Sequence, residues 1–174
     1  RFLFPHAPRI PVTINGGMVM RAWYDIREMS IDRKVDEETL KASAQKIHDL
    51  IDREVARGID PTRIVLAGFS QGGAVVYEAA LSYAKPLAGL LVLSSYLATA
   101  DSLQRHPANQ ELPVLVQHGV QDPVVPEVLG QRAQAQLKTW GSPVVYERYP
   151  VEHGVCPQQV PVISRSLGQR LGGA

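Results

Sequence analysis

Residues 63–77 constrain the fold of this chain more than any other stretch. An apolar, partly β-branched run ends in Gly-Phe-Ser-Gln-Gly and continues without a break into small and apolar residues. This order predicts a buried strand, a sharp turn and a buried helix, which is the context of a nucleophile elbow. The turn would project the Ser70 hydroxyl above the end of a sheet. Because the pentapeptide alone is a weak signal, the prediction rests on the strand and helix around it.

Buried strands and helices alternate along the rest of the chain. Apolar runs predict strands at 2–4, 87–93, 114–117 and 144–149, with an irregular segment at 11–31. Helical spacing and end signals predict helices over 36–57, around 129–140 and from Pro157 onward. The inner face of the last helix is predicted to carry Val160, Ile163, Leu167 and Leu171. The alternation predicts one α/β domain over 1–174, with a mostly parallel sheet and helices on both faces.

Three polar residues follow predicted strand ends. Ser70 follows one strand, Asp122 a later one and His153 the last. Active sites of parallel sheets lie at the carboxyl ends of the strands, and the chain order Ser, Asp, His is the order found in α/β-hydrolases. Each residue alone has an ordinary alternative, since Asp122 could bond its own turn and His153 could be any polar loop residue. Together they predict a catalytic triad.

The other titratable candidates are assigned to structure. His48 falls on the outer face of the predicted helix 36–57, and His118 ends a strand where it is expected to pack. His106 lies in a polar loop with no evident partner. Cys156 precedes a helix start and is assigned to packing.

Composition excludes several classes of function. The chain is 45% hydrophobic with a formal net charge of +1, and it has no cluster of Lys or Arg. A nucleic-acid or anionic-membrane surface is therefore not expected, and no apolar stretch is long enough to insert stably in a bilayer. One cysteine excludes a disulfide framework. No export signal is visible, so we expect a cytoplasmic protein without metal or organic cofactor.

Three segments together resemble the signatures of a known family. They are Leu-Ala-Gly-Phe-Ser-Gln-Gly-Gly-Ala from residue 66, His-Gly-Val-Gln-Asp-Pro-Val-Val-Pro from residue 118, and Glu-His-Gly from residue 152. Trp-Tyr-Asp-Ile from residue 23 is similar to a further stretch. The chain resembles the phospholipase/carboxylesterase family, which includes bacterial carboxylesterases and acyl-protein thioesterases. The resemblance implies an α/β-hydrolase fold and suggests a homodimer.

One departure from the family pattern concerns the oxyanion hole. Family members begin with further strands and a His-Gly-Leu-Gly type of loop that supplies one oxyanion N–H, and no segment here matches it. We expect the first strands to be missing, a segment of roughly forty to fifty residues. The backbone N–H of Gln71 is then the identifiable donor, and loss of the other would cost about a hundredfold in turnover.

The predicted reaction is acyl transfer to water. Ser70 attacks a carboxylic ester of a small or medium acyl chain, His153 takes its proton, Asp122 orients the imidazole and the Gln71 N–H binds the oxyanion. The acyl group is predicted to lie against Trp23, Tyr96, Leu97 and Val124, which stand in or beside the loops that carry the triad.

Two alternatives stay open from the sequence. Hydrolysis of acyl-protein thioesters or of lysophospholipids uses the same chemistry, and residues alone cannot separate it from ester hydrolysis. A catalytically impaired scaffold or binding domain of the same fold would account for the missing oxyanion loop. It would not explain why Ser, Asp and His are all retained.

Overall fold

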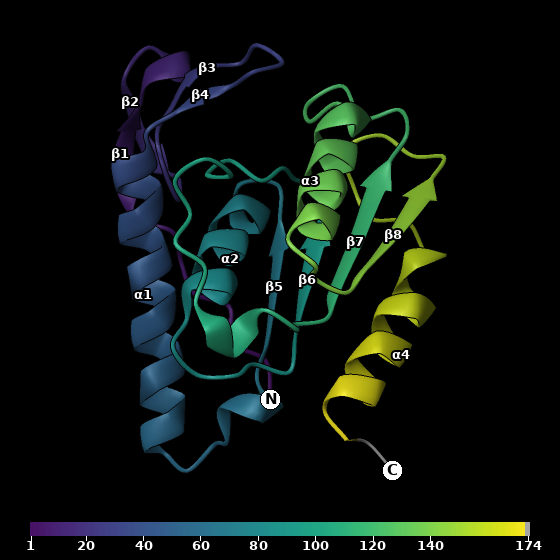
Figure 1. Ribbon diagram of the computed structural model, residues 1–174. Helices are drawn as coiled ribbons and strands as arrows, with labels where there is room; N and C mark the ends of the chain where they lie inside the picture. The colour runs from purple at the N-terminus through teal and green to yellow at the C-terminus, as the bar shows by residue number, and fades with distance from the viewer. Residues whose placement is uncertain (173–174) are drawn as a thin grey trace.

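A four-stranded parallel sheet forms the centre of the molecule (Figure 1). In this computed structural model, which describes residues 1–172, the strands are β5 (Val65–Phe69), β6 (Gly89–Leu93), β7 (Val114–Gly119) and β8 (Val144–Tyr149). They lie in the order β5-β6-β7-β8, with β7 buried along its whole length. The parallel sheet predicted from the apolar runs is confirmed, because such runs suit strands that are covered on both faces.

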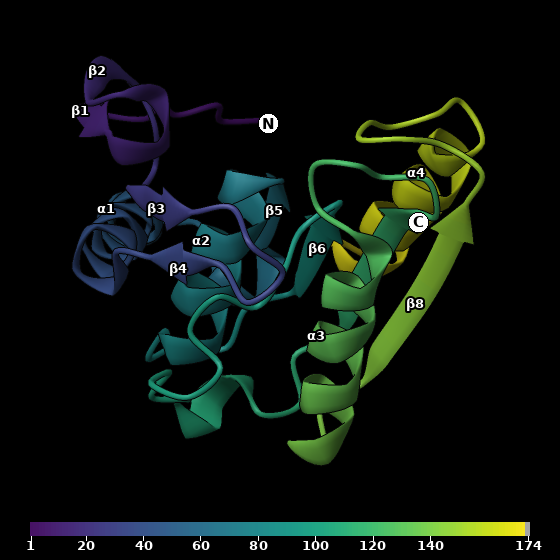
Figure 2. The ribbon, with the colours of Figure 1, turned by 90° about the horizontal axis from the view of Figure 1, so that it is seen from above.

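Helices cover both faces of this sheet (Figure 2). Helices α2 (Gln71–Ser82) and α3 (Glu127–Thr139) lie on one face, and α4 (Gln159–Arg170) lies on the other. Helix α1 (Glu37–Ala56) packs against α2 rather than against the sheet. Nine of the 12 residues of α2 are buried because the helix lies between the sheet and α1. This position accounts for its lack of a polar face.

Two small antiparallel hairpins precede α1, where the sequence predicts an irregular segment. Strands β1 (Arg9–Val12) and β2 (Met18–Arg21) pair around a 3-10 turn at Thr13–Asn15. Strands β3 (Ile26–Glu28) and β4 (Lys34–Val35) form the second pair. The prediction of an irregular segment is therefore wrong. The hairpins escape a search for alternation because β2 is exposed on both faces.

The predicted strand at residues 2–4 does not form. Residues 1–8 carry no regular structure, and Phe2 and Phe4 are 74% and 86% exposed. An extended segment becomes a strand only when a neighbour takes up its backbone hydrogen bonds, and no described strand lies beside these residues. Apolar composition alone was therefore a misleading signal.

Helix α4 begins two residues later than predicted, and one of the four residues predicted for its inner face, Val160, is exposed, whereas Ile163, Leu167 and Leu171 are partly buried. Val160 is 57% exposed, whereas Gln159 is buried at 1%. Gln159 turns inward because its amide bonds Gln117 of β7, so a polar contact sets the rotation of the helix. Short 3-10 segments at Pro61–Arg63 and Pro107–Asn109 complete the described structure. No helix within residues 1–172 has both the length and the apolar character needed to cross a bilayer.

Candidate active site

Ser70 stands on a strained turn between β5 and α2. Its backbone has φ 53° and ψ −120°, a conformation that is costly for a residue with a Cβ. Gly68 makes the turn possible, because a Cβ there would lie well inside van der Waals contact with the Gly72 carbonyl. The Ser70 N–H donates to the Leu93 carbonyl at 3.0 Å, and the Ser95 hydroxyl donates to the Ser70 carbonyl at 2.6 Å. The end of β6 therefore holds the turn in place.

The three predicted polar residues meet above the carboxyl ends of β5, β7 and β8. Ser70 Oγ lies 3.0 Å from His153 Nε2, and His153 Nδ1 lies 2.7 Å from Asp122 Oδ2. In the tautomer that satisfies both contacts, Nδ1–H donates to the carboxylate and Nε2 accepts the serine hydroxyl. The Asp122 side chain is fully buried and the His153 side chain is 18% exposed. This arrangement can transfer a proton from Ser70 to His153.

The loop after β7 fixes the Asp122 carboxylate. Asp122 Oδ1 accepts the backbone N–H groups of Val124 and Val125 at 2.9 and 2.8 Å, which leaves Oδ2 for His153. The fully buried His118 donates from Nε2 to the Val125 carbonyl at 2.8 Å, with the same nitrogen 3.8 Å from Asp122 Oδ2. His118 packs, as predicted, and it also braces the loop that carries the carboxylate.

A buried polar chain supports the loop that carries His153. Gln159 Nε2 donates to Gln117 Oε1 at 3.1 Å, and Gln159 Oε1 accepts the Cys156 N–H at 2.8 Å. Gln117 Nε2 in turn donates to Glu147 Oε2 at 2.8 Å, and the Tyr149 hydroxyl donates to the same oxygen. Burial and this carboxylate raise the pKa of Tyr149 to about 12, so its hydroxyl stays a donor. The sequence analysis missed these residues, and polar residues inside otherwise apolar strands were the available signal.

A pocket of about 230 Å³ opens beside Ser70. Ser70 and Gln71 form one side of it, and Tyr96 lies in its lining. Most of the remaining lining is apolar and comes from the two hairpins and the loop after β7: Val12, Ile14, Met20, Ala22, Ile26, Met29 and Val124. Such a pocket suits an apolar group attached to a carbonyl at Ser70.

Two arginines, Arg21 and Arg33, also line this pocket. Arg33, whose φ is 28°, donates from Nη2 to the Val124 carbonyl and places its guanidinium carbon 5.0 Å from the centre of the Tyr96 ring. The Tyr96 and Tyr24 hydroxyls are hydrogen-bonded at 2.6 Å. Burial and the neighbouring Tyr96 raise the pKa of Tyr24 well above its usual value, so this pair stays neutral.

The four residues predicted to contact the acyl group divide into two pairs. Tyr96 and Val124 line the pocket, whereas Trp23 and Leu97 are not among its lining residues and pack against the hydrophobic core. Along 22–26 the buried side chains alternate, with Ala22, Tyr24 and Ile26 inward. Trp23, which is partly buried, contacts the core beside the first turn of α2 and is absent from the pocket lining.

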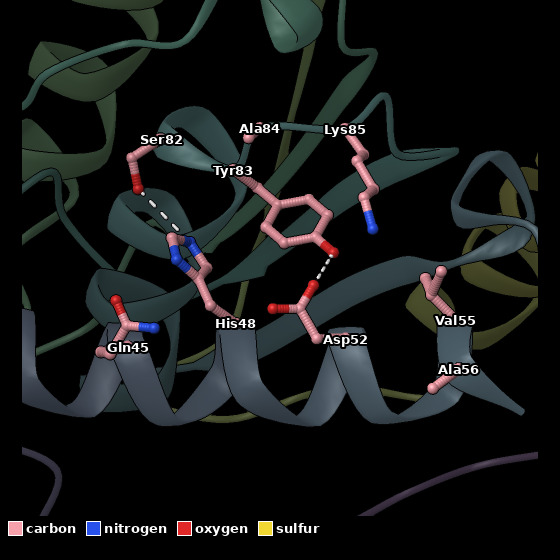
Figure 3. Close-up of a pocket in the computed structure, with 9 residues that line it drawn as sticks. All are labelled: Gln45, His48, Asp52, Val55, Ala56, Ser82, Tyr83, Ala84 and Lys85. Atoms are coloured by element: carbon pink, nitrogen blue, oxygen red, sulfur yellow. Dashed lines mark hydrogen bonds between the residues drawn. The ribbon is translucent and has the colours of Figure 1, made fainter.

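A second histidine–serine pair lies in a groove of about 520 Å³ between α1 and the end of α2 (Figure 3). His48, predicted to face outward, is half-buried and donates from Nε2 to the Ala79 carbonyl at 2.7 Å. Ser82 Oγ lies 3.4 Å from that nitrogen but donates to the Glu78 carbonyl at 2.6 Å. The imidazole N–H and the serine O–H each already donate to a backbone carbonyl, so this pair is not arranged as a nucleophile and its base.

His106 also differs from its prediction. Its Nδ1 accepts the Ala108 N–H at 3.1 Å and caps the 3-10 segment at Pro107–Asn109, so this histidine has a partner within its own loop. Cys156 is partly buried and unpaired with another cysteine, as a single cysteine must be.

Comparison with known proteins shows the family of this chain. The profile of the phospholipase/carboxylesterase family matches residues 1–170. The chain belongs to this family. Acyl-protein thioesterase 1 of Gibberella zeae is 39% identical over 181 residues, which cover 98% of this chain and 77% of the relative. The family assignment makes the protein a member of a hydrolase family.

Solved structures support the same fold. SOBER1 of Arabidopsis thaliana superposes with a TM-score of 0.90 at 32% identity, over 97% of this chain and 83% of that one. Acyl-protein thioesterase 2 of Zea mays superposes with a TM-score of 0.83 at 29% identity, over 97% of this chain and 80% of that one. The α/β-hydrolase fold predicted from the sequence is confirmed.

Proposed function

We propose that the protein is a serine hydrolase that cleaves acyl thioesters and esters through Ser70. The observation that carries this proposal is the hydrogen-bonded series from Ser70 through His153 to Asp122 at the mouth of an apolar pocket. A serine hydroxyl is a weak nucleophile until an adjacent base accepts its proton. The described contacts supply such a base and a carboxylate that orients it.

The proposed reaction has two steps. Ser70 Oγ attacks the carbonyl carbon while its proton moves to His153 Nε2, and the Gln71 N–H at the start of α2 stabilises the oxyanion. The bond to the leaving group then breaks, and His153 gives its proton to the departing sulfur or oxygen. A water molecule attacks the acyl-enzyme by the same route, which releases the carboxylic acid and restores Ser70.

The pocket beside Ser70 is the proposed site of the acyl chain. Its walls are mostly aliphatic side chains and methionines, which favour a linear hydrocarbon over a polar group. Tyr96 and Val124 keep the role proposed for them from the sequence. Ile14, Met20 and Met29 take the place of Trp23 and Leu97 in this proposal because they line the pocket.

We favour an acylated cysteine of a protein or peptide as the substrate. This choice is supported by relatives that are named acyl-protein thioesterases, one of them 39% identical over 98% of the chain. Two competing proposals remain. One is hydrolysis of carboxylic esters of small or medium acyl chains, which is the function predicted from the sequence. The other is hydrolysis of lysophospholipids. The chemistry at Ser70 is common to all of them.

The nucleophile is tested by intact-mass analysis after exposure to a fluorophosphonate. We expect one adduct on the wild-type chain, none on Ser70→Ala, and one on Ser164→Ala, a matched change at an exposed serine of α4. An adduct that persists in Ser70→Ala would assign reactivity to another residue. A folded wild-type chain without an adduct would favour the scaffold alternative.

The substrate class is tested by competition. We expect a palmitoylated peptide to inhibit hydrolysis of p-nitrophenyl octanoate and to be deacylated with a larger kcat/KM. Turnover of the aryl ester without deacylation of the peptide would favour a carboxylesterase. Preferential release of fatty acid from a lysophospholipid would favour a lysophospholipase.

The homodimer implied by family resemblance stays a prediction, which sedimentation equilibrium would test.

A further inference from the structure

The side chain of Gln71 makes two hydrogen bonds that the contacts among Ser70, His153 and Asp122 do not require. Its Oε1 accepts the backbone N–H of Trp23 at 3.1 Å, and its Nε2 donates to the backbone carbonyl of Tyr24 at 3.1 Å. Helix side chains lean toward the N-terminus of their helix, so Gln71 reaches back across the turn from the first position of α2. One amide thus clamps a dipeptide far away in the sequence.

Helix α1 holds the same dipeptide from another side. The Ser43 hydroxyl, on a residue only 2% exposed, donates to the Trp23 carbonyl. The Trp23 indole nitrogen lies beside the first turn of α2, 3.8 Å from where a Cβ on Gly72 would stand. Trp23 and Tyr24 are therefore a fixed connection between α1 and the turn that carries Ser70, which explains their placement better than contact with substrate.

One end of this clamp lines the pocket beside Ser70, and the other end adjoins a lining residue. Gln71 lines the pocket, and so does Ala22, which directly precedes the clamped dipeptide. Tyr24 also reaches the pocket indirectly, because its hydroxyl is bonded to that of Tyr96, a lining residue. An acyl chain in the pocket would therefore touch the wall and the clamp at once.

We propose that the Gln71 side chain is a positioning residue that couples filling of the acyl pocket to placement of the Gln71 backbone N–H. The proposal rests on the proposed function, in which this N–H stabilises the oxyanion. An oxyanion donor works only within a narrow range of distance. A pocket wall that fixes the position of Gln71 therefore affects how well its N–H stabilises the transition state. A long acyl chain presses on that wall and an acetyl group does not. Chain length should then raise kcat and not only lower KM.

Gln71→Met tests this coupling, because methionine has a similar length and flexibility but forms neither amide hydrogen bond. We expect kcat for p-nitrophenyl octanoate to fall about tenfold and kcat for p-nitrophenyl acetate about twofold, with smaller changes in KM. Gln131→Met, the same change at an exposed position of α3, should leave both esters unaffected. An equal fall for the two esters, or no fall, would overturn the coupling.

A second variant covers the case in which Gln71→Met does not fold. Tyr24→Phe keeps the ring and removes the hydroxyl bonded to Tyr96, so it loosens the far end of the same wall. It should reduce kcat for the octanoate more than for the acetate, and equal effects would again contradict the coupling. Fluorophosphonate labelling separates the two proposals. A wild-type chain that labels and turns over esters leaves the proposed function standing even if the coupling fails.

Discussion

On one side of the Ser70 pocket the residues stand at the ends of a buried parallel sheet, and on the other side they stand on two short hairpins. The sheet side carries Ser70, which lines the pocket, and through it His153 and Asp122, which follow Ser70 in a hydrogen-bonded series. Hydrogen bonds to the backbone or to buried side chains hold each of the three. The hairpin side carries Ile14, Met20 and Met29, which are 39%, 38% and 45% exposed. The two sides of one pocket therefore differ in how firmly they are held.

This difference matches the demands of the two tasks. Proton transfer requires heavy atoms within hydrogen-bond distance, and a misplacement of about 1 Å can cost a hundredfold in rate. An aliphatic chain makes no directional contact, so its wall tolerates movement. We infer that changes on the sheet side act on kcat, whereas changes on the hairpin side act on KM. The predictions below test this division.

The largest effect is expected for Asp122→Asn. An amide in place of the carboxylate favours the wrong imidazole tautomer, so kcat should fall by roughly 10³- to 10⁴-fold while KM changes little. Steady-state kinetics on p-nitrophenyl octanoate measures both constants. Asp101→Asn, the same change at an exposed loop position, serves as the control. A fall of less than tenfold would remove Asp122 from the proposed triad.

Gly119→Ala should damage both activity and stability. A Cβ at this position would stand well inside van der Waals contact with the Val151 and Glu152 carbonyls, so the loop that carries His153 must move. We expect kcat to fall about a hundredfold and the free energy of unfolding to fall by about 1–3 kcal/mol. Urea titration and kinetics measure these changes. Gly168→Ala, where a Cβ meets open space, should be silent, and equal behaviour of the two variants would contradict the prediction.

Ile14→Ala probes the hairpin side. The substitution removes apolar contact with a bound chain and leaves the sheet untouched, so KM for p-nitrophenyl octanoate should rise roughly three- to tenfold at constant kcat. KM for the acetate should not change. Ile59→Ala alters a residue of similar exposure outside the pocket and should affect neither ester. A loss in kcat would show that the hairpins also position the reacting groups.

The smallest effect is expected at the start of α3. Glu127 accepts two hydrogen bonds from Arg148, and this guanidinium lowers the pKa of the carboxyl below its ordinary value. The pair therefore stabilises the folded chain above the unfolded pKa, near 4.5, and the contribution disappears as pH falls through the lower folded value. Glu127→Gln should lower the melting temperature slightly at pH 7, and by less as the pH falls below 4.5.

Thermal unfolding across this pH range measures the difference between wild type and variant. Glu111→Gln, at an exposed loop position, should show no such pH-dependent difference. A difference for Glu127→Gln that persists unchanged at pH 3 would mean that the ion pair is not its source.

Much of the sheet and its site could be predicted from the sequence. Apolar runs predicted β6 and β7, the strand β8 was also predicted, and the Gly-Phe-Ser-Gln-Gly motif predicted the turn after β5. Parallel strands end at the same edge, so the polar residues that follow them were expected to meet, and the described distances agree with that expectation. Their catalytic role stays a proposal until Ser70 is tested.

The hairpins and the pocket wall could not be predicted in the same way. Residues 2–4 have the composition of a strand but no described neighbour to pair with. Trp23 is an aromatic residue near the triad loops, but it is not among the residues that line the pocket. His48 likewise has a hydrogen-bond partner, the Ala79 carbonyl, that no local pattern indicates. In each case the deciding contact lies outside the local sequence pattern.

The sequence by itself determined the α/β order, the family and the strand ends that carry Ser70, Asp122 and His153, because period and burial are local properties of a chain. Only the tertiary structure decided which residues line the pocket, how Gln159 sets the face of α4 and how Gln71 clamps Trp23 and Tyr24. The contacts of Gln159 and Gln71 are hydrogen bonds between residues more than forty positions apart. Such bonds exist only once the elements have packed.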